Sequence, residues 1–142
     1  MHIVIQLITS FIATAGFAMM FNAPRQTLVQ SGMTGMLGWI IYFVLEPYCG
    51  MVISTMVATF MVGVFSQLCA RVYKMPVIIF SVAGIIPLVP GGIAYASMRK
   101  FVENNYSVAV ELAAQVFLIS GSITVGLVLS EVLNQINRRI RS

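Results

Sequence analysis

Five long stretches without a charged residue dominate this sequence. They run Met1–Pro24, Gln26–Leu45, Pro47–Ala70, Met75–Met98 and Leu112–Ser130, and they are 19 to 24 residues long. A helix that spans a bilayer needs about 20 mostly apolar residues, so four of the stretches qualify. The second is weaker, because it begins with polar residues and its apolar part, Met33–Leu45, is short. We therefore expect one all-α integral membrane domain over 1–142, with about five transmembrane helices and four as the alternative.

Composition excludes several other classes of protein. Only 8% of the residues are charged, against about 25% in soluble domains, and the mean hydropathy is +0.96. The net charge is +4, but the sequence has no dense face of Lys and Arg that could neutralise phosphates. We expect the lipid bilayer to surround the chain, and we expect no nucleic-acid partner.

The sequence also lacks the residue sets of enzymes and metalloproteins. It contains no Asp, one His and two Cys, and no His/Cys/Asp/Glu cluster has ligand spacing, so we expect no metal site. No Ser/His/Asp set, Walker loop or GxGxxG motif is present. We therefore predict no enzyme activity, no catalytic residue and no cofactor.

The few charges predict an orientation. With five spans, six basic residues share one side of the membrane: Arg25, Arg71, Lys74, Arg138, Arg139 and Arg141. Arg99 and Lys100 lie on the other side. Since Lys and Arg are enriched in cytoplasmic loops, we expect the N-terminus outside and the C-terminus in the cytoplasm. The tail Glu131–Ser142 is expected to extend the last helix into the cytoplasm.

The most specific local motif is IIPLVPGGIAY at Ile85–Tyr95. Pro87 and Pro90 cannot donate backbone hydrogen bonds, and Gly91 and Gly92 follow at once. A helix break inside a bilayer is tolerated only against protein or beside a water-filled cavity. A half-helix that starts at the glycines would turn free N–H groups toward the membrane centre, which suits a carboxylate. Tyr95 lies just beyond the break and is a further ligand candidate; the alternative is a proline kink that only improves packing.

Three spans carry small or polar residues at helical spacing. The stripes are Gln6, Ser10, Thr14 and Ala18 on the first span, Thr55, Thr59, Gly63 and Gln67 on the third, and Ser122, Gly126 and Ser130 on the last. Such stripes most often mean close helix packing. A polar substrate path is the alternative, and Gln6 and Gln67 are its best candidates, because a glutamine is costly to leave in lipid.

No acidic residue falls at the centre of a span. Glu111 opens the last span and Glu46 follows the second. Proton-coupled transporters need a membrane-embedded ionisable group, so Glu111 is the first candidate for proton coupling and Glu46 the second. The alternative interpretation is that both are interfacial charges, with the coupling group on another chain.

The sequence resembles a known transporter family. FNAPR at Phe21–Arg25, the glycine-spaced segment Gly32–Gly38 and PVIIFSVAGIIPLVPGGIAYASM at Pro76–Met98 are similar to the C-terminal half of the threonine/serine exporter family. The resemblance implies a separately encoded small subunit of a secondary exporter, driven by protons, in the bacterial inner membrane. It also implies a larger membrane subunit as partner, and hence an oligomer.

The resemblance leaves the substrate open. Threonine and serine are the first expectation, and carboxylates are the second, because related two-subunit systems are associated with succinate export. A non-transporting scaffold or assembly subunit is a further alternative. Arg25 is expected either to attract an anionic substrate or to act as an ordinary cytoplasmic anchor. The predicted substrate-binding residues are Pro87, Pro90, Gly91, Gly92, Tyr95, Arg25 and Gln67.

Overall fold

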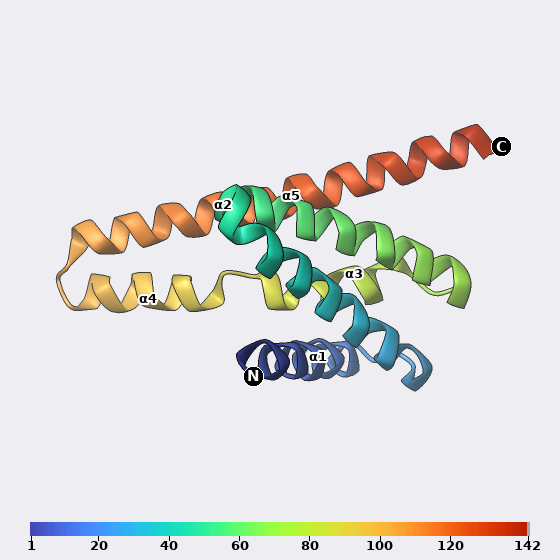
Figure 1. The fold of residues 1–142 in the computed structure, drawn as a ribbon, viewed down its shortest axis with the longest axis horizontal. Coiled ribbons are helices and arrows are strands. Elements are labelled where there is room, and N and C mark those ends of the chain that lie inside the picture. The colour runs from blue at the N-terminus through green and yellow to red at the C-terminus, as the bar shows by residue number, and fades with distance from the viewer. Residues whose placement is uncertain (142) are drawn as a thin grey trace.

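The computed structural model describes residues 1–141, which form helices joined by short turns and contain no strand (Figure 1). The helices are α1 (His2–Met20), α2 (Leu28–Tyr73), α3 (Val77–Ile85), α4 (Gly91–Val102) and α5 (Tyr106–Arg141), with 3₁₀ turns at Arg25–Thr27 and Ile86–Leu88. The predicted all-α class is confirmed. The tail extends α5 as far as Arg141, and Ser142 lies outside the described residues.

Helix α2 is two helices joined at a sharp bend. Its 46 residues would reach about 69 Å in a straight helix, more than twice the bilayer core of about 30 Å. Gly50 interrupts it with φ 82° and ψ 172°, a conformation that glycine adopts because it has no Cβ. Figure 1 shows the two halves diverging from this bend. The halves, 28–49 and 51–73, are each about as long as one span.

The division at Gly50 bears on the number of spans. By length and composition, three helices can cross a membrane, or four if the bent pair Val77–Leu88 and Gly91–Val102 forms one span. Counting the two halves of α2 separately gives the five segments that the charge-free stretches predict. The second stretch, which looked too short in sequence, thus belongs to a helix that begins at Leu28.

Small residues let the helices cross closely. A Cβ added to Gly126 of α5 would lie 2.7 Å from the backbone oxygen of Met56 in α2. Gly38 in the first half of α2 lies equally close to Val62 in the second half, where an added Cβ would be 2.6 Å from a methyl carbon. Apart from Gln6, every residue of the three predicted stripes is buried. Close packing therefore accounts for most of the stripes.

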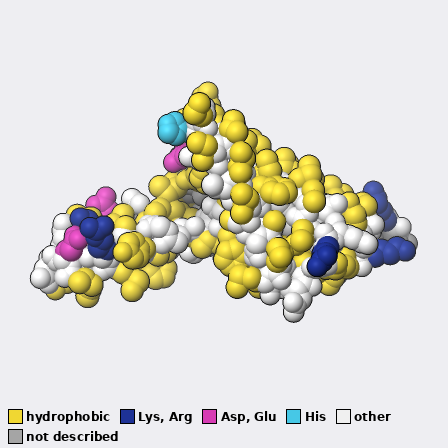
Figure 2. Space-filling model, turned by 90° about the horizontal axis from the view of Figure 1, so that it is seen from below, with side chains coloured by type: hydrophobic (Ala, Val, Ile, Leu, Met, Phe, Trp, Pro, Cys, Tyr) yellow, Lys and Arg dark blue, Asp and Glu magenta, His cyan; other side chains and the backbone are white. Residues whose placement is uncertain are grey.

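Helix α4 and the first part of α5 form an arm that extends from the other helices (Figure 1). Helix α4 has no buried residue. Its end carries ion pairs from Arg99 and Lys100 to Glu103, at 3.1 and 3.3 Å. Figure 2 shows the Lys and Arg side chains gathered toward the two ends of the long axis, with a broad hydrophobic surface between them. This distribution fits a protein that crosses a bilayer along that axis.

Candidate functional site: two cavities at the helix break

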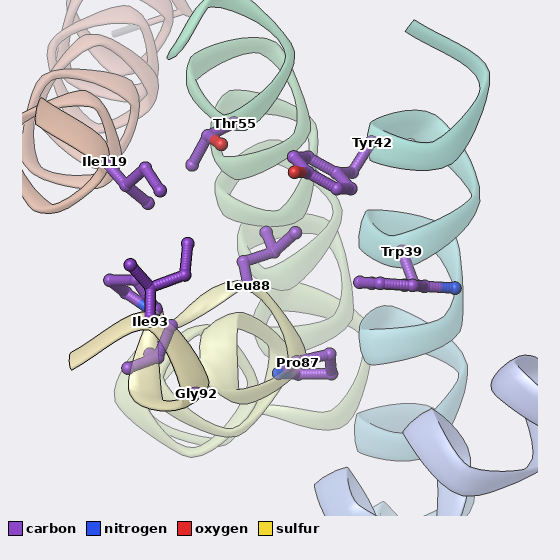
Figure 3. Close-up of a pocket in the computed structure, with 10 residues that line it drawn as sticks. Trp39, Tyr42, Thr55, Pro87, Leu88, Gly92, Ile93 and Ile119 are labelled. Carbon is purple, nitrogen blue, oxygen red and sulfur yellow. The ribbon is translucent and has the colours of Figure 1, made fainter. Parts of the chain in front are cut away.

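A cavity of about 180 Å³ lies against the predicted helix break (Figure 3). We call it the break cavity. Its lining comes from α2, the break, α4 and α5: Trp39, Tyr42, Thr55, Pro87, Leu88, Val89, Pro90, Gly92, Ile93 and Ile119. Sites for drug-sized ligands measure roughly 300–1,000 Å³, so this cavity suits a smaller molecule. The lining is mostly apolar, with few polar groups to orient a ligand.

The local sequence explains why the helix is interrupted beside this cavity. The 3₁₀ turn ends at Leu88, the next residue Val89 is extended with ψ 133°, and Pro90 has no N–H. The first helical bond of α4 runs from the Ala94 amide to the Pro90 oxygen, at 3.0 Å. The amides of Gly92 and Ile93 precede this bond, so they belong to the first turn, whose N–H groups have no partner within a helix. The positive end of the α4 dipole therefore lies beside the cavity.

A second cavity, of about 380 Å³, lies on the α1 side of the break. We call it the α1 cavity. Its lining residues are Gln6, Thr9, Ser10, Ala13, Trp39, Ile86 and Pro87. Trp39 and Pro87 line both cavities. The two spaces therefore adjoin the same aromatic ring and the same proline, where α1, α2 and the break meet.

Two buried polar atoms beside the α1 cavity have no hydrogen-bond partner within residues 1–141. They are the carbonyl oxygen Oε1 of Gln6 and the indole nitrogen Nε1 of Trp39. Most buried polar side-chain atoms in proteins are hydrogen-bonded, and leaving one unpaired costs about 1–3 kcal/mol. Two residues that line the α1 cavity thus carry one acceptor and one donor without partners in the described residues.

The structure brings some of the predicted site residues together. Pro87, Pro90 and Gly92 all line the break cavity. Gly91 begins α4 immediately beside them but is not part of the lining. Tyr95 is 68% exposed and also lies outside the lining. The motif therefore forms one site, from which Tyr95 on α4 is separate.

Arg25 and Gln67 lie elsewhere. Arg25 is exposed in the 3₁₀ turn that follows α1. Gln67 is buried where α2 crosses α5, and its side-chain amide donates a 3.1 Å hydrogen bond to the Ser130 carbonyl. Gln67 therefore joins two helices. The other glutamine named from the stripes, Gln6, is the one that lies beside the break.

The two acidic candidates differ in their relation to the break cavity. Glu46 lies one turn after Tyr42 on α2, near enough for its charge to act on the hydroxyl of that tyrosine. Tyr42 in turn lines the break cavity. Glu111 is exposed on α5 and lines neither cavity. Glu46, the second candidate from sequence, is thus the acidic residue that neighbours a residue of the cavity lining.

Sequence reasoning did not select four residues that complete the site. Thr55 belongs to a stripe, so its position on a buried helix face was visible in sequence. Trp39 is the only tryptophan in the chain. Its position near the end of the weak second stretch did not indicate that it lines a cavity. Tyr42 and Ile119 carry no sequence signal of their own, because they reach the cavity only through the bend of α2 and the path of α5.

Comparison with known proteins agrees with the motifs. The family model described as "Threonine/Serine exporter, ThrE" matches residues 6–133. A threonine/serine exporter of Corynebacterium glutamicum is 28% identical over 96% of this chain and 27% of its own length. The chain thus spans about a quarter of that relative. No solved structure matches the chain significantly. The family model covers nearly the whole sequence, and the chain therefore belongs to the threonine/serine exporter family.

Proposed function

We propose that this chain is the small subunit of a secondary exporter for threonine and serine in the bacterial inner membrane. The break cavity carries the proposal. It is small, it lies at a helix break within the predicted fourth span, and it is lined by Pro87, Pro90 and Gly92. Membership of the exporter family supports the amino-acid substrate, as does the likeness to the threonine/serine exporter of C. glutamicum.

In this proposal the first turn of α4 binds the substrate carboxylate. The amides of Gly92 and Ile93 supply N–H donors beside the cavity, and the helix dipole favours a negative charge there. The absence of a side chain at Gly92 lets a ligand approach the backbone closely. Broken helices bind carboxylates in this way in secondary transporters.

The relative's length and the exposed arm support a larger membrane partner. This chain corresponds to 27% of the C. glutamicum exporter, and secondary transporters form their sites between repeated halves. The α4–α5 arm leaves large apolar side chains uncovered: Tyr95, Met98, Phe101, Val110 and Phe117. In our proposal the partner half docks on this arm, giving a hetero-oligomer. We keep the orientation that the basic residues favour, with the N-terminus outside and the C-terminus in the cytoplasm.

Proton coupling is assigned to Glu46 first and Glu111 second. Glu46 lies near the hydroxyl of Tyr42, and Tyr42 lines the break cavity. A change of charge at Glu46 would therefore alter the electrostatic environment of Tyr42 in the cavity wall. Glu111 keeps a secondary place because it lies on the arm where the partner is proposed to dock.

A dicarboxylate such as succinate is the second candidate substrate, and one observation favours it. A third cavity, of about 410 Å³, is lined by three basic residues, Arg71, Lys74 and Arg138, and by no acidic residue. Such a lining attracts a dianion more strongly than a zwitterionic amino acid. Arg25 does not line this cavity, so it is proposed as a membrane anchor.

The test is efflux from cells loaded with threonine, serine or succinate. Cells that express this chain with its larger partner are compared with cells that express the partner alone. We expect faster loss of threonine and serine when both are present. Faster loss of succinate alone would transfer the assignment to dicarboxylates. Equal retention of all three, with both subunits inserted, would leave the assembly subunit as the function.

A further inference from the structure

We propose that the third cavity, beside the turn from α2 to α3, binds the phosphate headgroup of an anionic phospholipid. We call it the basic cavity. It measures about 410 Å³, and its lining comes from the end of α2, the turn, the start of α3 and the last part of α5. The inference goes beyond the proposed function and does not depend on it, because it concerns the binding of a lipid rather than export.

The first observation is the charge of the lining. It includes three basic residues, Arg71, Lys74 and Arg138, and no acidic residue. All three are exposed, so a ligand that enters the cavity can reach them. The amide of Gln67 donates to the carboxylate of Glu131 at 3.5 Å, but Glu131 lines a neighbouring cavity. Three basic residues outweigh this one acidic residue, and a cleft of one charge sign attracts the opposite sign.

The second observation is a contact that brings the basic residues together. The guanidinium of Arg71 at the end of α2 donates a hydrogen bond to the side-chain oxygen of Asn134, which is buried on α5. Arg138 follows Asn134 by one helical turn, so the two residues are neighbours on one face of α5. Lys74 follows Arg71 by three residues. Because a guanidinium has five N–H groups, Arg71 keeps donors for a ligand while Asn134 holds it in place.

The start of α3 adds backbone donors to the same cavity. Val77 begins α3 and lines the cavity, and Pro76 before it has no N–H. The Ile79 amide makes the first bond of this turn, to the Pro76 oxygen at 3.3 Å. The Val77 amide therefore belongs to the first turn, whose N–H groups have no partner within a helix. The positive end of the α3 dipole thus lies beside the three basic side chains, which together suit a phosphate.

The position of the cavity points to a lipid as the source of the phosphate. The half of α2 from 51 to 73 is about as long as one span, so Arg71 and Lys74 lie where that span ends. Figure 1 shows the end of α2, the end of α5 and the turn from α1 to α2 toward the same end of the molecule. The basic residues favour the cytoplasmic side for this end, and basic pockets between transmembrane helices on that side bind lipid headgroups.

Apolar side chains on each segment of the cavity separate a lipid from a soluble anion. Val72 on α2, Ile78 on α3 and Ile136 on α5 neighbour the lining in sequence and are more than half exposed. The acyl chains of a phospholipid can cover such side chains, whereas inorganic phosphate or succinate cannot. We therefore assign the basic cavity to a lipid such as phosphatidylglycerol, in place of the dicarboxylate considered above.

The experiment measures the melting temperature of the purified chain in a neutral detergent as ligands are added. Phosphatidylglycerol is compared with phosphatidylcholine of the same acyl chains, and with inorganic phosphate and succinate at the same concentrations. We expect phosphatidylglycerol alone to raise the melting temperature, by several degrees and to a plateau, because a ligand that binds only the folded state stabilises it.

Paired variants separate the cavity from the general charge of the surface. Lys74→Gln combined with Arg138→Gln removes two charges from the lining, and we expect this protein to lose most of the rise. Arg25→Gln combined with Arg141→Gln removes the same charge at exposed positions outside the cavity, and it should keep the rise. Melting temperatures without lipid show whether each variant folds. If the cavity variant melts lower than the wild type, Arg138→Gln alone replaces it and should lose part of the rise.

Four outcomes would overturn the inference. The absence of any rise in the wild type would remove the site, and an equal rise with phosphatidylcholine would remove the role of the charge. Equal losses in the two double variants would show attraction to the whole surface rather than to the cavity. A rise with inorganic phosphate or succinate that matches phosphatidylglycerol would assign the cavity to a soluble anion.

Native mass spectrometry gives a second, independent readout. Phosphatidylglycerol should remain bound to the wild type and to the control variant when they are released from detergent. We expect the variant with Lys74→Gln and Arg138→Gln to lose this adduct. An adduct retained equally by all three proteins would contradict a lipid site in the basic cavity.

Discussion

The helix break and the crossing of α2 with α5 use glycine in opposite ways. At the crossing, Gly126 touches the backbone of α2, and an added Cβ would lie 2.7 Å from the Met56 oxygen. At the break, a Cβ added to Gly91 or Gly92 would meet nothing within 4 Å. The crossing therefore needs glycine for packing, whereas the break leaves space around it.

The same two regions differ in their polar groups. At the crossing, the hydroxyls of Thr59 and Ser130 donate to backbone oxygens at 2.7 Å, and Gln67 donates to Ser130. At the break, Gln6 and Trp39 keep unpaired atoms. At the crossing, polar side chains therefore stabilise the contact between helices, whereas those at the break leave hydrogen-bonding capacity unused within the described residues.

The largest expected effect is on stability, from Gly126→Val. The new side chain would press on the backbone of Met56 and Phe60, which cannot rotate away. Overpacking of this kind costs about 1–3 kcal/mol, so we expect a clear fall in the melting temperature of the purified protein. Thermal unfolding in detergent measures it.

Gly121→Val is the matched control on the same helix. A Cβ at Gly121 meets nothing within 4 Å, so the melting temperature should stay close to that of the wild type. An equal fall in melting temperature for the two variants would show that the close contact of α5 with α2 does not make position 126 more sensitive to a larger side chain than position 121.

The next effect is on transport, from Gly92→Leu. Leucine at this position would fill part of the break cavity, which Gly92 lines, and its Cβ would meet no atom within 4 Å. We expect threonine efflux to fall about tenfold or more at an unchanged melting temperature. Gly91→Leu is the control, since Gly91 has the same open surroundings but is not part of the lining. Similar losses in both variants would remove the reason to place the substrate at the cavity.

A smaller effect is expected on proton coupling. Glu46→Gln removes a titratable group that interacts with Tyr42 in the cavity wall. The dependence of threonine efflux on an imposed pH gradient should weaken several-fold, and Glu111→Gln should weaken it less. Efflux assayed in vesicles at several gradients measures both. The reverse order would move the coupling group to the arm.

The smallest effect is expected at the exposed tip of the arm. Hydrogen bonds from Lys100 and Arg99 lower the pKa of the Glu103 carboxyl from its ordinary 4.5. A lowered pKa in the folded state adds stability that is present above pH 4.5 and is lost as the pH falls through the lower value. Below pH 4.5, the melting temperature of the Glu103→Gln protein should therefore fall slightly less steeply with decreasing pH than that of the wild type. An acid titration followed by thermal unfolding checks this.

Local signals in the sequence predicted much of the fold. The charge-free stretches predicted helices, and the Pro87–Gly92 motif predicted a break, because both depend on neighbouring residues. The site was harder to predict. Trp39 reaches the cavity only because α2 bends at Gly50, and Gln6 and Gln67 look alike on their stripes. Their different partners come from helices far apart in sequence, which no local pattern contains.

We propose that the transported amino acid occupies the cavity lined by Gly92. Substrate protection tests it most directly: cysteine is placed at position 92 in a chain whose exposed Cys49 is replaced by serine. The rate of alkylation is then measured with and without threonine in an active transporter. We predict that threonine slows the reaction of Gly92→Cys and not that of Gly91→Cys. Equal rates for Gly92→Cys with and without threonine would contradict the account.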